Sequence, residues 1–430
     1  MSKVIVWLKN DLRLADNELF YQATKNNKDI LPVFIFDPRQ FKKLPELGFS
    51  KTGALKTKFL IESVAYIRAE LKKMGANLIV RVGHPEKILP EVATNINAEA
   101  IYLTKEVTFE EQQVVNQLEL ELSKTGVALN QHWQGALYHE EDVPWPIRQV
   151  PQVFTTFRKE TQKESPVREV FNRPSSINYI AGIAEGEIPT VTDLGLDEEK
   201  IDGKAVIQFQ GGEGAAWDRL NEYFWEKDLL KEYKATRNGL LGADYSSKLS
   251  PWLAVGAISA KLIYHEIKKY EAERTSNQST YWLYFELVWR DFFTYMAKQN
   301  NSNIFKYEGF NGTPPEVNNG LDTFEKWKNG ETGEPFVDAN MKELLLTGYM
   351  SNRGRQNAAS YLMYNLKVNW TWGAAWYENR LIDYDPCSNW LNWAYIAGVG
   401  NDPRQGRHFN IESQQQRYDP KGEYIDYWLG

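Results

Sequence analysis

Residues 383–400, DYDPCSNWLNWAYIAGVG, combine side chains that are costly to place together: aspartate, asparagine, tryptophan and the only cysteine of the chain. A buried carboxylate needs strong hydrogen-bond donors, which Arg353 and Arg355 could supply. Because Asp383 and Asp385 stand just before a proline, we expect them in a turn and not on a helix face. Aromatic side chains at helical spacing usually fill a core. A large planar polar ligand would satisfy both the carboxylates and the tryptophans, and a flavin has that shape.

A second polar set lies in FELVWRDFF, which places Glu286, Trp289 and Arg290 on one face of a helix. A Glu–Arg pair at this spacing is often only a surface ion pair worth ~0.3–0.5 kcal/mol. Here the neighbours are apolar nearly all round, which indicates a buried helix. We therefore expect Glu286 to belong to a site.

Two further segments have an ordinary and a functional interpretation. In YSSKLSPWLAVG, residues 245–256, serines before a helix-opening proline are common capping residues. The same serines, Ser246 and Ser247, could instead hold phosphates at a helix start. In SNRGRQNAAS, residues 351–360, the basic residues could form a solvated turn, but the Tyr and Met residues on either side favour a buried cleft.

The composition limits the classes of protein that fit. A chain of 430 residues is expected to hold two or three domains. The net charge of −7 argues against a general nucleic-acid coat protein, but it leaves room for a local basic groove. A single cysteine excludes an internal disulfide, and the five scattered histidines form no metal-binding pattern. Without a signal peptide or an apolar run of ~18 residues, we expect a cytoplasmic, monomeric protein with no metal and no membrane contact.

The first ~130 residues alternate strand and helix patterns, which predicts a doubly wound parallel sheet. No G-x-G-x-x-G follows the first strand, so we expect no NAD bound in that manner. The predicted buried strands are 4–8, 30–36, 77–83, 100–107 and 127–133, and the clearest helices are 52–73 and 108–124.

Proline-rich residues 135–214 are predicted to form an extended connector, and from residue 215 onward the patterns are helical. The expected helices are 211–233, 250–270, 281–299, 338–348, 355–366 and 372–381. We therefore predict an α/β domain over 1–134, a connector over 135–214 and an all-α domain over 215–430.

These motifs resemble the photolyase/cryptochrome flavoproteins, and most closely the DASH cryptochromes. The resemblance spans nearly the whole chain, through VIVWLKNDLRLADN, LYHEEDVPWPIRQVPQVFTTFRK, YSSKLSPWLA, FELVWRDFF, TGYMSNRGRQNAASYL and DYDPCSNWLNWAYIAGVGNDPR. It implies an N-terminal domain with an antenna pigment, usually the folate 5,10-methenyltetrahydrofolate, and a helical domain holding FAD.

The resemblance also implies roles for individual residues. The FAD phosphates and ribose would contact Tyr233, Ser246, Ser247, Lys248, Leu249 and Ser250. Around the flavin rings would lie Glu286, Arg290, Asn352, Arg355, Asp383, Asp385 and Asn389, of which Glu286, Asn352, Arg355 and Asn389 would be catalytic. A DNA lesion would contact Glu286, Trp289, Asn352, Arg353, Gln356 and Tyr395, and Glu106 would contact the folate.

Two departures from the family pattern affect the expected function. Gln356 and Tyr395 stand where repair photolyases have methionine and tryptophan, which implies a weaker grip on a lesion flipped out of a duplex, a step that costs a few kcal/mol. Trp393 and Trp370 match the inner members of an electron-transfer chain, but the outer member aligns with Val317. Either Tyr307 or Trp327 takes its place, or outward electron transfer is poor.

We therefore expect a light-driven enzyme that uses reduced FAD to repair cyclobutane pyrimidine dimers, preferentially in single-stranded DNA. The alternative is a blue-light photoreceptor with a signalling role and little repair. A dark flavin oxidoreductase would need a nicotinamide site, for which no fingerprint is present.

Overall fold

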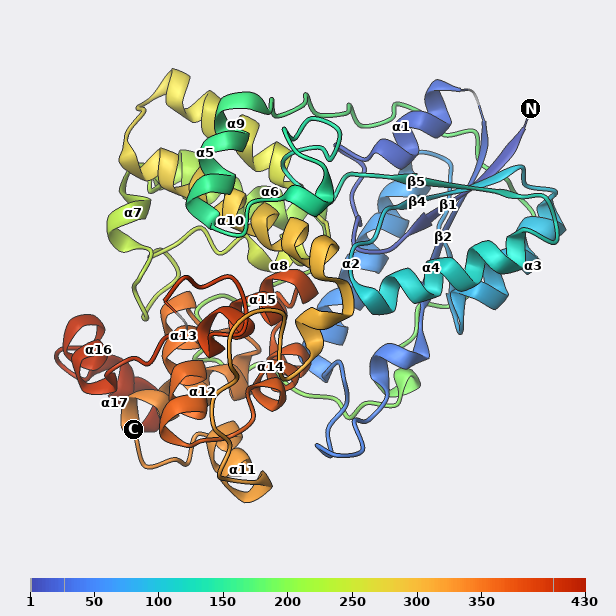
Figure 1. The fold of residues 1–430 in the computed structure, drawn as a ribbon. Helices are drawn as coiled ribbons and strands as arrows, with labels where there is room; N and C mark the ends of the chain where they lie inside the picture. The colour runs from blue at the N-terminus through green and yellow to red at the C-terminus, as the bar shows by residue number, and fades with distance from the viewer. Residues whose placement is uncertain (1, 27, 405) are drawn as a thin grey trace.

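The N-terminal part of the chain is a parallel sheet in the order β3-β2-β1-β4-β5, in a computed structural model that describes residues 2–26, 28–404 and 406–430 (Figure 1). Side chains of β1 alternate between two hydrophobic cores, with Val4 and Val6 in one and Ile5 and Trp7 in the other. The sheet is therefore covered on both faces, as predicted for a doubly wound α/β region. Its strands are β1 (Lys3–Leu8), β2 (Asp29–Phe36), β3 (Ile79–Val82), β4 (Ala100–Thr104) and β5 (Ala128–His132).

Helices α1 (Glu18–Lys25), α2 (Ala54–Lys73), α3 (Pro85–Ile96) and α4 (Phe109–Leu122) accompany these strands. The prediction of five buried strands is wrong for β5, whose residues are exposed or half-buried. This strand lies at the edge of the sheet, and its polar sequence ALNQH does not require burial. Strand β4 also ends at Thr104, earlier than predicted.

The connector is more regular than predicted, because it contains helix α5 (Phe154–Glu164). No proline falls between Pro151 and Pro166. The buried residues Phe154, Phe157 and Thr161 give α5 one apolar face. The Phe154 ring stacks on Trp289 with centroids 3.6 Å apart, so α5 packs against the helical region.

The C-terminal part is helical, and α10 (Gln278–Asn300) is its longest helix. The helix predicted over 250–270 is two helices, because the backbone turns at Gly256, where φ is +66°. The helix predicted over 211–233 ends in a π-turn at Glu222–Glu226. Helices α11, α15, α16 and α17 were not predicted. The remaining helices are α6 (Glu213–Asn221), α7 (Tyr233–Thr236), α8 (Ser250–Ala254), α9 (Ala260–Glu273), α11 (Leu321–Asn329), α12 (Pro335–Thr347), α13 (Asn352–Ser360), α14 (Trp370–Arg380), α15 (Pro386–Ala397), α16 (Ile411–Tyr418) and α17 (Glu423–Leu429).

Buried carboxylates join the helical part to the sheet region, which lie side by side in Figure 1. Asp291 of α10 accepts the backbone N–H groups of Leu137 and Tyr138, each at 2.8 Å. Glu213 accepts those of Leu14 and Ala15 at 3.0 and 3.1 Å. Each carboxylate satisfies backbone donors that would otherwise be left unpaired at the junction.

Candidate active site

A cavity of about 540 Å³ lies among α7, α8, α10, α13 and α15. A recess of about 90 Å³ adjoins it, and the two share Asn352, Gln356, Ser388, Asn392 and Ile396. Together they are lined by every residue that the sequence assigned to FAD and to the lesion. Segments far apart in the chain thus meet around one continuous space.

At one end of the cavity, the serine-rich segment 245–250 leads into α8. Arg219 fixes this segment from α6, because its guanidinium donates to the carbonyls of Ser246 and Ser247 at 3.1 and 3.0 Å. Lys248 has a left-handed backbone conformation with φ of +53°, which is uncommon for a residue with a side chain. The sequence analysis missed Arg219, since one arginine in an otherwise ordinary helix carries no signal.

In the recess, the Asp383 carboxylate is held by two donors. Arg355 donates to its Oδ2 at 2.8 Å, and the Ser250 hydroxyl donates to the same oxygen at 2.7 Å. Burial alone would lower the pKa of Arg355, but the neighbouring Asp383 raises this pKa above its ordinary value. Asp383 lies in the turn before α15, and Asp385 caps that helix by accepting the N–H of Ser388 at 2.7 Å. The predicted turn is present, and Arg355 makes the predicted pairing, whereas Arg353 donates to Gln356 and Asn238 instead.

Four residues that line this space have a buried polar atom with no hydrogen-bond partner among the described residues: Asp383 Oδ1, Lys248 Nζ, Arg353 Nε and the Tyr245 hydroxyl. Leaving such groups unpaired costs about 1–3 kcal/mol each. The acceptor lies in the recess, and the cationic donors lie along the larger cavity. This distribution fits a ligand with a planar N–H-bearing head and an anionic tail, which is the chemistry of FAD.

Glu286 does not form the ion pair with Arg290 that helical spacing would allow. Its Oε1 accepts a hydrogen bond from Arg237 at 2.5 Å, whereas Arg290 donates to the carbonyl of Gly135. The Glu286 side chain is 29% exposed, so the helix is less buried than its sequence indicated. Burial of the carboxyl group nevertheless raises the pKa of Glu286. The sequence analysis missed Arg237, which lies 49 residues away along the chain.

The residues assigned to the lesion lie together beside Glu286. Arg353 donates to Gln356 at 2.9 Å, and Trp289 contacts Tyr395 with ring centroids 6.0 Å apart. Tyr395 accepts a hydrogen bond from Arg407 at 2.8 Å. The result is a wall of aromatic, amide and guanidinium groups on one side of the cavity.

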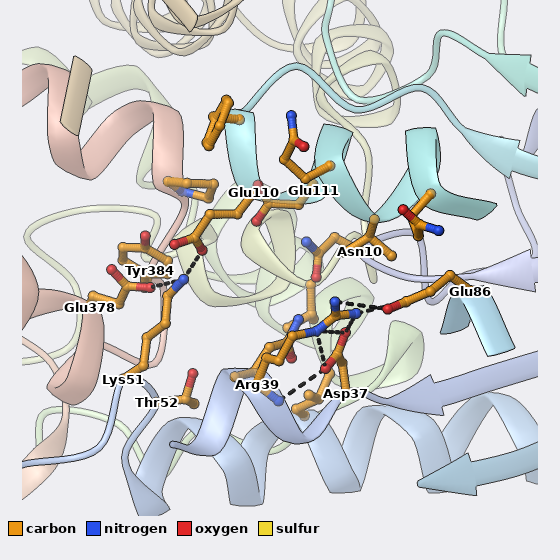
Figure 2. A pocket seen from close by; sticks show the side chains of 18 of the residues that line it. Asn10, Asp37, Arg39, Lys51, Thr52, Glu86, Glu110, Glu111, Glu378 and Tyr384 are labelled. Atoms are coloured by element: carbon orange, nitrogen blue, oxygen red, sulfur yellow. Dashed lines mark hydrogen bonds and ion pairs between the residues drawn. The ribbon is translucent and has the colours of Figure 1, made fainter. Parts of the chain in front are cut away.

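A second cavity, of about 1000 Å³, lies against α4 and the loops after β1 and β2. Figure 2 shows Arg39 between Asp37 and Glu86, and Lys51 bonded to Glu110 and Glu378. Glu106, the predicted antenna contact, is not among the lining residues; it pairs with Lys9 at 2.7 Å. Tyr384 lines both this cavity and the recess.

The chain matches known proteins along its length. The family model "DNA photolyase" matches residues 4–175, and "FAD binding domain of DNA photolyase" matches 282–430. Cryptochrome DASH of Gloeobacter violaceus is 46% identical over 99% of this chain and 85% of its own length. Its counterpart from Synechocystis is 47% identical over 99% and 87%.

This chain belongs to the DASH cryptochrome family.

Solved structures agree with this membership. The crystal structure of a Synechocystis cryptochrome has a TM-score of 0.96 at 46% identity, covering 100% of this chain and 89% of that one. A class III photolyase from Agrobacterium tumefaciens has a TM-score of 0.85 at 25% identity, with coverage of 100% and 86%. The DASH cryptochrome fold confirms the α/β and all-α classes, whereas the domain boundaries at 134 and 214 stay predictions.

In this DASH cryptochrome, the matched FAD-binding segment supplies α10, α13 and α15, while Tyr233 and residues 245–250 join the cavity from outside that segment. Among the described residues, no helix is long and apolar enough to cross a membrane. Three plant relatives are named "chloroplastic/mitochondrial", so the cytoplasmic location stays a prediction.

Proposed function

We propose that FAD occupies the cavity and recess, and that the protein uses it to repair cyclobutane pyrimidine dimers in DNA. A bound, reduced FAD would supply the light-driven electron that splits the dimer and would take that electron back afterwards. The chain's own residues position the partners and set the local charge. Asp383 and Arg355 would hold the rings, and residues 245–250 would hold the phosphates.

The observation that carries this proposal is the position of Glu286 in the same cavity as the flavin contacts. With its raised pKa, Glu286 keeps a proton more readily than an ordinary carboxyl group, so it would donate to a thymine carbonyl. Arg237 would fix its orientation, and Arg353 would favour the negative charge that forms on the dimer.

Single-stranded DNA is the preferred substrate in this proposal. Gln356 and Tyr395 are already engaged with Arg353 and Arg407. They therefore offer less apolar surface to a base extruded from a duplex. Extrusion costs a few kcal/mol, and a single strand largely avoids this cost.

Glu286→Gln is expected to lower the repair yield roughly tenfold while FAD stays bound, since a hydrogen bond to a charged group contributes about 1.5–3 kcal/mol. The glutamine presents an amide N–H in place of the carboxylic O–H and cannot release a proton. Single-turnover illumination of reduced protein with dimer-containing DNA measures the yield. Glu273→Gln, at an exposed position on α9, is the matched control.

An unchanged yield in the Glu286 variant would contradict the assigned role. Comparison of single-stranded and duplex substrates tests the substrate preference. If the wild-type protein repairs neither, the alternative of a blue-light photoreceptor is favoured.

We also propose that the second cavity holds the antenna, 5,10-methenyltetrahydrofolate. Its acidic lining suits the positively charged methenyl bridge of that pigment, and Tyr384 would separate it from the flavin. Glu106 would act indirectly, through Lys9.

Val114→Trp is expected to abolish folate binding, because Val114 lines this cavity and indole would fill part of it. The near-ultraviolet absorbance of protein incubated with the folate and then desalted measures the binding. The flavin content should not change, and full folate retention would place the antenna elsewhere.

A further inference from the structure

Trp370 is buried, and the main chain of Tyr307 lies against its indole N–H. The Trp370 indole N–H donates to the Tyr307 carbonyl at 3.0 Å, and Trp370 itself is 1% exposed. The segment containing Val317 covers this region, since the N–H groups of Asn318 and Asn319 both bond the carbonyl of Lys367. Val317 is 41% exposed, but valine has no group that can be oxidised by a tryptophan radical.

Trp370 is connected to the recess through α15. The ring centroids of Trp370 and Trp390 lie 6.0 Å apart. Trp390 precedes Trp393 by one turn of α15, and Trp393 lines the recess. Gly373, one turn along α14 from Trp370, is packed so closely on Trp393 that a Cβ there would collide with the indole ring. Helices α14 and α15 therefore pack tightly where Gly373 meets Trp393, and this contact fixes the position of Trp370 relative to Trp393.

A second aromatic branch leaves Trp393 through buried rings. Trp327 lies 6.1 Å from Trp393, and Tyr377 lies 5.0 Å from it. Trp327 is fully buried, its N–H donates to the carbonyl of Ala358, and Phe324 beside it is also fully buried. Beyond Trp327, Phe324 contacts the half-buried Trp372 with ring centroids 5.8 Å apart, but phenylalanine is not readily oxidised. An electron vacancy on this branch would therefore stay on Trp327 or Tyr377.

We propose that Tyr307 is the surface end of the electron-relay chain, in place of a tryptophan. This inference rests on the proposed binding of FAD, which would supply the acceptor for an electron from Trp393. Trp370 returns an electron to oxidised Trp393, and Tyr307 returns one to Trp370 while releasing its phenolic proton to water. An external thiol then restores Tyr307 by giving up a hydrogen atom, and two thiyl radicals combine as a disulfide.

The surroundings of Tyr307 suit this role. The residue is half-buried, so part of it reaches solvent, and its main-chain carbonyl contacts the Trp370 indole. Its hydroxyl donates to the carbonyl of Pro315, which holds the ring in place. Burial, together with the neighbouring Glu308, raises the pKa of Tyr307, so the phenol keeps its proton until it is oxidised.

Tyr307→Phe is expected to lower the rate of flavin photoreduction several-fold, in FAD-loaded full-length protein under blue light with excess dithiothreitol. Tyr427→Phe is the matched control, because Tyr427 is a 40%-exposed tyrosine whose hydroxyl also donates to a backbone carbonyl. Trp327→Phe tests the buried branch and should leave the rate unchanged. Flavin content and melting temperature confirm that each variant is folded and loaded.

Two further measurements make the outcome decisive. Transient absorption should show a tyrosyl radical in the wild type that is absent from Tyr307→Phe, and adding Val317→Trp to that variant should restore the rate. An unchanged rate in Tyr307→Phe, or a slow rate in Trp327→Phe, overturns the proposal. Repair by chemically reduced protein bypasses the relay, so a failure of the repair proposal is seen separately.

Discussion

Replacement of Asp383 by asparagine is expected to give protein that folds but does not retain FAD. The Asp383 side chain is 2% exposed and is the ionic partner of Arg355, so the neutral amide leaves the half-buried guanidinium without a counter-charge, hydrogen-bonded to the Met350 carbonyl. Breaking a buried ion pair in this way costs about 3–5 kcal/mol. The flavin absorbance after gel filtration measures retention, and the melting temperature without added FAD measures the stability of the protein itself.

A double-mutant cycle separates the two effects of this change. Arg355→Met combined with Asp383→Asn removes both charges, so it should recover part of the lost stability but no flavin binding. Asp322→Asn, at an exposed position in α11, is the control for the substitution itself. Normal flavin retention in Asp383→Asn would show that the free Oδ1 does not face the ligand.

Asp291→Asn is expected to lower the free energy of unfolding by about 2–4 kcal/mol. Both carboxylate oxygens accept backbone N–H groups, whereas an amide can accept only one and turns an NH₂ group toward the other. Urea denaturation followed by circular dichroism measures the loss. A change below about 0.5 kcal/mol, typical of surface positions, would mean that this junction does not contribute to stability.

The same residue predicts a pH dependence. Burial raises the pKa of Asp291 from 3.8 to about 7, so between these values the folded chain holds a proton that the unfolded chain has lost. Stability should therefore fall as the pH rises from about 4 to about 7. Burial likewise raises the pKa of Glu343 to about 7, which adds to the same trend. In Asp291→Asn the fall should be shallower, and an equal slope would contradict the assignment.

Sequence patterns predicted the secondary structure best where the conformation of a short segment depends only on its own residues. The strands β1 and β2 follow from runs of apolar residues, and the turn at Asp383 follows from the proline that comes after it. The α5 helix was missed because its apolar face depends on Trp289, far along the chain. Edge position made β5 exposed, and no property of the strand itself reveals its place in the sheet.

The site shows the same division between local and distant information. The motifs brought the right residues to one cavity, including the Arg355–Asp383 pair. The partner of Glu286 was not predicted, because helical spacing points only to Arg290 while the folded chain places Arg237 nearer. Arg219 and Arg237 act across 25–50 residues of sequence, a distance over which spacing rules say nothing.

The turn before α15 limits which substitutions the protein can accept, because it separates two binding sites. Asp383 and Asp385 line the recess, Pro386 lines the second cavity and Tyr384 lines both, so a partition one residue thick separates the recess from the second cavity. A substitution of Tyr384 therefore affects the binding of both ligands. We expect that an engineered change of pigment on one side of this boundary will require a compensating change on the other side. We also expect the residue at position 384 to vary in homologues that bind only one of the two ligands.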